Sequence, residues 1–312
     1  MARRRAYTRK PLRRYRRKPS TRRSYSKKRS TYTRRRSGMS NRRILNVSSK
    51  KKRDTMTTYS SPGDLSTPVQ GPLLLYADGI AANYGCFVIP WVATARDVEE
   101  PRQGDEHLRT SSTCYMGVYV SSTCYMRGLR EQLRIYTSSD VPWEWRRICF
   151  TFKGSAIIGP DATPFWFENS AGWQRLVRPL TSSASTSADL ATADRLINHL
   201  FEGSYGTDFH DLFTAKAESR MLTVKYDKVT IIRSGNARGT LSVKKLWHPM
   251  NANLSYDDQE HGSDVVSEYA STEGKPGMGD YYVVDLFKPH PSGGNADRLT
   301  FGSQATLYWH ER

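Results

Sequence analysis

The sequence lacks any long apolar run. No stretch approaches the roughly 18–20 consecutive apolar residues needed to cross a bilayer, so we expect no membrane partner. The amino-terminal segment is charged throughout and lacks the apolar core typical of a secretory signal peptide. Cysteine is also scarce. Four cysteines in 312 residues do not make a disulfide framework, which predicts reduced thiols and a cytosolic or nuclear setting.

Acidic residues are absent from the first 53 positions. This segment holds 24 of the 48 Lys and Arg residues, and the first carboxylate of the chain is Asp54. Residues 54–312 therefore carry 24 basic and 30 acidic side chains, a balance of 24 − 30 = −6. We interpret the chain as a polycationic arm at 1–53 joined to a mildly acidic globular domain at 54–312.

Residues 1–43 are low in complexity and consist mainly of Arg, Lys, Ser, Thr and Tyr. Such a segment buries too little apolar surface to offset the entropy cost of ordering, so we expect a disordered basic arm. Its cation density predicts nonspecific nucleic-acid binding through counterion release, and its spaced tyrosines suit stacking on the bases of a single strand. Its basic clusters also match short nuclear-import signals, which predicts an import receptor as a partner.

The predicted nucleic-acid-binding residues are all the cations of the arm: Arg3, Arg4, Arg5, Arg9, Lys10, Arg13, Arg14, Arg16, Arg17, Lys18, Arg22, Arg23, Lys27, Lys28, Arg29, Arg34, Arg35, Arg36, Arg42, Arg43, Lys50, Lys51, Lys52 and Arg53. The base-stacking candidates are Tyr7, Tyr15, Tyr25 and Tyr32.

After Asp54 the pattern favours β-structure. Short runs of aromatic and β-branched residues alternate with Gly, Pro, Asn and Asp clusters. The expected strands are 55–59, 84–92, 113–121, 130–137, 146–153, 175–179, 222–232, 240–245, 281–287 and 305–309. Apolar residues at helical spacing over 191–201, after Asp189 as the N-cap, predict one short inserted helix. The pattern indicates an all-β sandwich or barrel with long loops, and it does not separate a jelly roll from an immunoglobulin-like sandwich.

Motifs for catalysis or metal binding are missing, so we expect no enzyme, no cofactor and no metal. The cysteines (Cys86, Cys114, Cys124, Cys149) form no C-x-x-C pair, and we interpret them as small core residues rather than zinc ligands. The segment 274–277 lacks the spacing of a phosphate loop. His199, His210 and His248 lie near carboxylates in the sequence, and we interpret them as structural. Asp257, Asp258 and Glu260 offer a candidate cation site, for which an exposed acidic loop is the favoured alternative.

Several longer motifs together carry a family resemblance. They are Lys51-Lys52-Arg53-Asp54-Thr55-Met56, Cys124-Tyr125-Met126-Arg127-Gly128-Leu129, Trp145-Arg146-Arg147-Ile148-Cys149-Phe150, Val224-Lys225-Tyr226-Asp227, Trp247-His248-Pro249-Met250-Asn251, Gly274-Lys275-Pro276-Gly277-Met278-Gly279-Asp280-Tyr281-Tyr282 and Ala305-Thr306-Leu307-Tyr308-Trp309-His310-Glu311. In these the chain resembles the capsid proteins of genomoviruses (gemycircularvirus-like), small circular single-stranded DNA viruses related to geminiviruses. The repeat of Ser-Ser-Thr-Cys-Tyr-Met at 111–116 and 121–126 departs from that pattern in its first copy.

The resemblance implies an eight-stranded viral jelly roll, a T=1 icosahedral shell of sixty identical subunits, an arm facing a single-stranded DNA genome, and location in the virion with assembly in the host nucleus. Sixty arms would carry 60 × 24 = 1440 cations, which neutralise on the order of 1,400 nucleotides of single strand. The alternative function is a stand-alone, non-enzymatic nucleic-acid-binding protein of chromatin or ribosomal type. It predicts a monomer or dimer in place of a shell.

Overall fold

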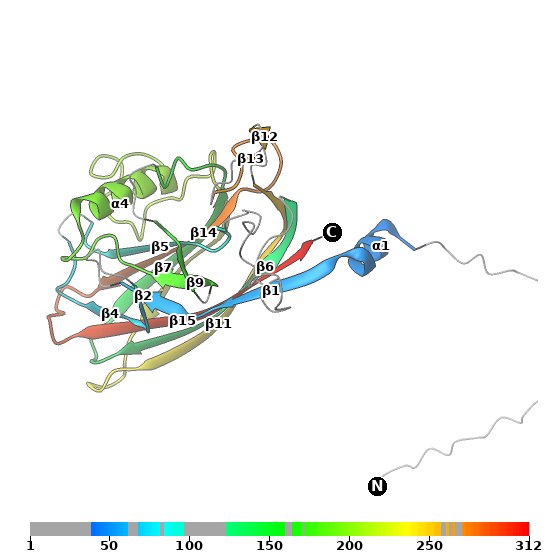
Figure 1. Ribbon diagram of the computed structural model, residues 1–312. Helices are drawn as coiled ribbons and strands as arrows, with labels where there is room; N and C mark the ends of the chain where they lie inside the picture. The colour runs from blue at the N-terminus through cyan, green and yellow to red at the C-terminus, as the bar shows by residue number, and fades with distance from the viewer. Residues whose placement is uncertain are drawn as a thin grey trace, which may run out of the picture. The chain divides into compact units, whose positions relative to one another are not determined.

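A computed structural model describes residues 39–61, 68–81, 84–96, 123–159, 164–170, 172–256, 260–261, 264–265 and 270–311 (Figure 1). Its helices are α1 (Asn41–Ser48) and α4 (Ser187–Leu200). Its strands are β1 (Lys50–Met56), β2 (Thr58–Ser60), β3 (Val69–Gln70), β4 (Leu73–Tyr76), β5 (Phe87–Val92), β6 (Thr123–Thr137), β7 (Trp143–Phe152), β8 (Phe167–Asn169), β9 (Gly172–Val177), β10 (Thr223–Ile232), β11 (Leu241–Ser255), β12 (Glu260–His261), β13 (Asp264–Val265), β14 (Asp280–Pro289) and β15 (Arg298–Glu311).

Two antiparallel sheets pack face to face. The first sheet has the order β1–β15–β6–β11, with β4 also pairing with β15, and the second sheet has the order β10–β7–β14–β5 (Figure 1). Most connections between consecutive strands cross from one sheet to the other. As a result, β15 lies between β1 and β6, and β14 lies between β5 and β7. Because β1 and β4 share one position, the two sheets have eight strand positions in all. This is the jelly-roll arrangement, and it confirms the predicted fold class.

The core lies between the inner faces of the two sheets. Strand β6 alternates buried and exposed residues, as a strand with one wet face does, whereas β14 is almost entirely buried. Trp91, Trp143 and Trp309 are fully buried large side chains from three different strands. A smaller sheet has the order β3–β2–β9–β8, in which β2 and β9 pair in parallel, and it contacts the first sheet where Thr58 of β2 hydrogen-bonds to Ser303 of β15.

Helix α4 confirms the predicted helix, with a different beginning. Thr186, not Asp189, is the N-cap, and Asp189 is the third residue of a capping box in which Thr186 Oγ1 accepts a hydrogen bond from the Asp189 N–H at 3.2 Å. Asp189 also accepts from Arg178 Nη2 at 2.8 Å. Leu196, Ile197 and Leu200 are buried, as the spacing predicted. Helix α1 was not predicted, because a run as short as 44–47 gives no clear period.

Several strands are longer than the sequence predicted. Strand β6 begins at Thr123 rather than 130, β15 begins at Arg298 rather than 305, and β11 continues to Ser255, well beyond 245. Glycine, proline and polar residues within these extensions, such as Gly128, Pro249 and Asn251, hide them from a search for apolar runs. Pro249 is accommodated because β11 is an edge strand, and its register shifts between Pro249 and Ala252. The predicted strand 113–121 and the first copy of the repeat lie outside the described residues.

Candidate nucleic-acid interface

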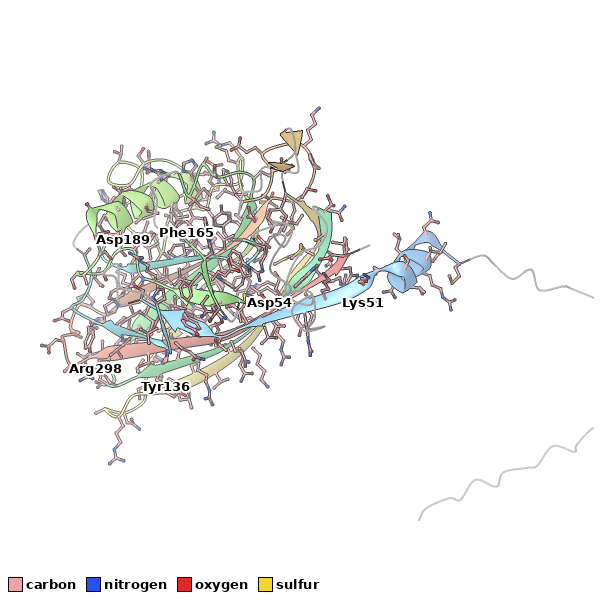
Figure 2. All side chains as sticks on the ribbon, viewed as in Figure 1. Lys51, Asp54, Tyr136, Phe165, Asp189 and Arg298 are labelled. Carbon is pink, nitrogen blue, oxygen red and sulfur yellow. The ribbon has the colours of Figure 1, made fainter. Side chains whose placement is uncertain are left out.

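The outer face of the first sheet is cationic. Side chains alternate between the two faces of a strand, so the outward residues can be assigned from burial and register. Its exposed or half-buried cations are Lys51 and Arg53 on β1, Arg127, Arg130 and Arg134 on β6, Lys245 on β11 and Arg298 on β15. We call this surface the cationic face. Figure 2 labels Lys51 toward one end of it and Arg298 toward the other.

The cationic face carries no carboxylate on β1, β4, β6, β11 or β15. These strands contain three acidic residues, Asp54, Glu131 and Glu311, and none of the three is exposed. Lys52 Nζ binds Glu311 Oε2 at 2.7 Å, and Arg96 Nη2 binds Asp54 Oδ2 at 2.7 Å. The negative charges of the sheet are therefore paired inside the molecule, and its exposed charges are of one sign.

Aromatic rings lie between these cations. The rings of Trp247 and Tyr308 lie 5.9 Å apart, and those of Tyr125 and His310 lie 6.1 Å apart. The position of Trp247 depends on Gly128, because a Cβ there would stand 2.7 Å from the indole ring. At the other end of the sheet Tyr136 is 39% exposed, and the Arg298 guanidinium lies 5.7 Å from the centre of the Tyr76 ring.

This combination suits a single strand of nucleic acid. Cations follow the phosphates, and exposed rings stack on bases in a manner that tolerates any sequence. Tyr125 and Tyr136 are eleven residues apart on β6, a span of about 37 Å along the strand. The face therefore has room for several nucleotides.

A buried ionic cluster connects the two sheets beneath the cationic face. We define it as Glu131, Arg147, Arg175 and Asp285, which are at most 1% exposed. Asp285 accepts from Arg147 Nε and Nη2, both at 2.8 Å, and from Arg175 Nη2 at 3.1 Å. Glu131 accepts from Arg147 Nη1 and from Arg175 Nε at 3.3 Å. Two carboxylates alternate with two guanidiniums, so the cluster is neutral as a whole.

The electrostatics of this cluster are set by burial and pairing. Burial alone would raise the pKa of Glu131, but Arg147 and Arg175 outweigh it and hold that pKa at about 2. His248 Nε2 lies 3.8 Å from Glu131 Oε2, yet burial lowers the pKa of His248 to about 4. At neutral pH Glu131 is therefore ionised and His248 is neutral.

The predicted DNA-binding residues divide into three groups. Those at positions 1–38, including all four candidate tyrosines, lie outside the described residues, as does the side chain of Arg42. Arg43 lies in α1. Lys50, Lys51, Lys52 and Arg53 lie in β1, paired with β15.

The predicted arm, which ends at residue 53, overlaps the folded unit, because that unit begins at Leu45 and β1 begins at Lys50. Lys52, a predicted DNA contact, lies in this overlap. It is 7% exposed and paired with Glu311, because its position in β1 points it inward. The basic motif 50–53 is therefore part of the jelly roll.

Sequence reasoning missed most of the cationic face. Arg130, Arg134, Lys245 and Trp247 carry no motif by themselves. The available signal was the alternation of Gln132, Arg134 and Tyr136 with the apolar Leu133 and Ile135 on one strand. Joining that stripe to β11 and β15 requires the strand order, which the sequence did not provide.

The structure also places the residues considered for other chemistry. Cys86, Cys124 and Cys149 are buried free thiols, as predicted for core residues, and Cys114 lies outside the described residues. His199 Nδ1 lies 2.8 Å from the Arg195 carbonyl oxygen within α4. Within the described ranges no three His, Cys, Asp or Glu residues group as metal ligands. Asp257 and Asp258 lie outside those ranges, as does the side chain of Glu260.

Comparison of the chain with protein-family models found no match, and comparison with curated proteins found none either. Among the described residues no helix has the length and apolar character needed to span a membrane.

Proposed function

We propose that the protein is a structural capsid subunit that encloses single-stranded DNA. The observation that carries this proposal is the cationic face, which has seven cations, several exposed rings and no carboxylate on its strands. A jelly roll is one of the folds that build viral shells, but it also serves other functions, so the fold alone does not decide the matter. The resemblance to genomovirus capsid proteins supports the same proposal.

The arm and the cationic face are parts of one DNA-binding system in this proposal. The basic sequence of the arm continues into β1, where Lys51 and Arg53 point outward from the first sheet. The arm condenses the DNA strand by charge neutralisation, and the strand then binds to the cationic face, where rings and guanidiniums are held on the sheet. No chemical step is part of this function.

The proposed shell has T=1 symmetry and sixty identical subunits, assembled in the host nucleus after import through the basic arm. Repeated contacts between copies need apolar surface outside the core. The edge strand β10 of the second sheet provides some of it, since Val229 is 44% and Ile231 is 64% exposed.

Electron microscopy and nuclease protection test the shell. The full-length protein and a version lacking residues 1–43 are each purified and incubated with circular single-stranded DNA. We expect closed, uniform particles that protect the DNA, and loss of protection without the arm. If both versions remain monomers or dimers while only the full-length protein shifts DNA, the stand-alone binding protein is the correct function.

A charge-matched pair of variants tests the cationic face. The first replaces Arg53, Arg130 and Lys245 with Gln, and the control replaces Lys225, Lys228 and Arg233, three exposed cations on or next to β10. Both variants lose three charges. If the face contacts phosphates, only the first lowers the salt dependence of binding, by about 2 in the slope of log K against log salt. If both variants change the slope equally, the cationic face does not contact the DNA.

A further inference from the structure

The edge of the first sheet is interrupted in the middle of β15. Strand β1 ends with Met56 opposite Ala305, and β4 begins with Leu73 opposite Phe301. Between these two points the chain leaves the sheet to form β2 and β3, so no strand of the described residues pairs with Gly302, Ser303 and Gln304 on that side. An open groove of about 470 Å³ lies at this interruption, on the cationic face.

The wall of the groove is held firmly to the sheet. Thr58 Oγ1 accepts from the Ser303 N–H at 2.7 Å and donates to the Ser303 carbonyl oxygen. The Gly71 N–H donates to the Thr58 carbonyl oxygen at 3.1 Å, which fixes the second side. Beneath the floor, Ser303 Oγ donates to Glu131 Oε1 at 3.0 Å and so connects the groove to the buried ionic cluster.

Three glutamine side chains line the groove. The side-chain amides of Gln70, Gln132 and Gln304 line it, and none of them makes a hydrogen bond within the part of the chain that the structure describes. Each amide offers two donors and an acceptor. Arg134 adds a cation and Tyr136 an exposed ring, and the lining includes no carboxylate.

Gly302 leaves the groove open. Its cross-strand neighbour is Arg134, and a Cβ at Gly302 would stand 3.4 Å from the Pro72 Cβ. That is an ordinary contact, so a side chain here would fit sterically at its first atom and then extend over the groove. Glycine at position 302 therefore keeps the groove free of a covering side chain.

We infer that the groove binds the base of one unpaired nucleotide of a single DNA strand. The base stacks on Tyr136, the glutamine amides hydrogen-bond to its edge, and Arg134 contacts a flanking phosphate. The volume lies within the range of about 300–1,000 Å³ that small-molecule sites occupy, which suits a nucleotide. This inference rests on the proposed DNA binding and adds a discrete site to it on each subunit.

Photocrosslinking of the full-length protein tests the site. The probe is a short oligothymidine with one 5-iododeoxyuridine, which crosslinks to an aromatic ring stacked on it, and the crosslinked residues are mapped by mass spectrometry. We expect a crosslink at Tyr136. The variant Gly302→Leu fills the groove without altering Tyr136, and it should lower that crosslink about tenfold, the loss expected for one stacked base.

Two further variants keep the test decisive. Thr306→Leu places the same leucine side chain at an outward position of β15 beyond the groove, and the crosslink at Tyr136 should persist. Gln132→Leu removes one amide from the exposed lining, so the crosslink should weaken even if Gly302→Leu does not fold. Crosslinks confined to tyrosines outside the groove, with DNA binding intact, would overturn the groove alone. Absence of any DNA binding would overturn the proposed function as well.

Discussion

Replacing Glu131 with Gln tests whether the buried ionic cluster holds the two sheets together. Glu131 lies on β6 of the first sheet, and Arg147 lies on β7 of the second. The substitution keeps the shape of the side chain but removes one of two negative charges from a neutral, fully buried set. It also directs an amide N–H toward guanidinium donors, so at least one buried donor loses its acceptor.

We expect Glu131→Gln to lower the free energy of unfolding by about 3–5 kcal/mol, the usual cost of removing one partner from a buried ion pair. Urea unfolding of the unassembled protein at neutral pH, followed by tryptophan fluorescence, measures this cost, since Trp91, Trp143 and Trp309 are fully buried. The control is Glu202→Gln, whose partner Lys216 is 2.8 Å away at the surface, and it should cost less than about 1 kcal/mol. Equal costs for the two variants would refute a structural role for the cluster.

Three other outcomes follow from single residues. Folding lowers the pKa of His248 from 6.5 to about 4, so the unfolded state binds more protons between these pH values and the free energy of unfolding should fall by roughly 3 kcal/mol as the pH drops from 6.5 to 4. His248→Gln should flatten this pH dependence, measured by urea unfolding at several pH values. An unchanged pH dependence would assign it to other groups. Gly128→Ala should lower the melting temperature, at a cost of about 1–3 kcal/mol, because its Cβ would stand 2.6 Å from the His248 carbonyl oxygen and 2.7 Å from the Trp247 ring. An unchanged melting temperature would mean that both the β11 backbone at His248 and the Trp247 side chain shift at no cost. Thr186→Ala should cost about 1 kcal/mol by removing the capping box of α4, measured by calorimetry, and no change would show that Arg178 and Asp189 suffice to hold the helix.

The sequence by itself determined the composition of the two parts and the class of the fold. Charge separation at Asp54 is visible without any structure, and so is the β-pattern of segments such as 222–232 and 281–287, because alternation and β-branched runs are local properties. The helix at 191–201 was predictable for the same reason, since its apolar spacing lies within a few turns.

Only the tertiary structure decided which charged side chains point outward and which are buried. Lys51 and Lys52 are neighbours in one basic motif, yet one points outward and the other is buried against Glu311, because successive side chains of a strand point to opposite faces. The cationic face joins residues from β1, β6, β11 and β15, and the groove exists because β1 and β4 share one edge of β15 with a gap between them. These relations depend on strand order and register between segments far apart in the chain, and such long-range pairing leaves no signature in local sequence.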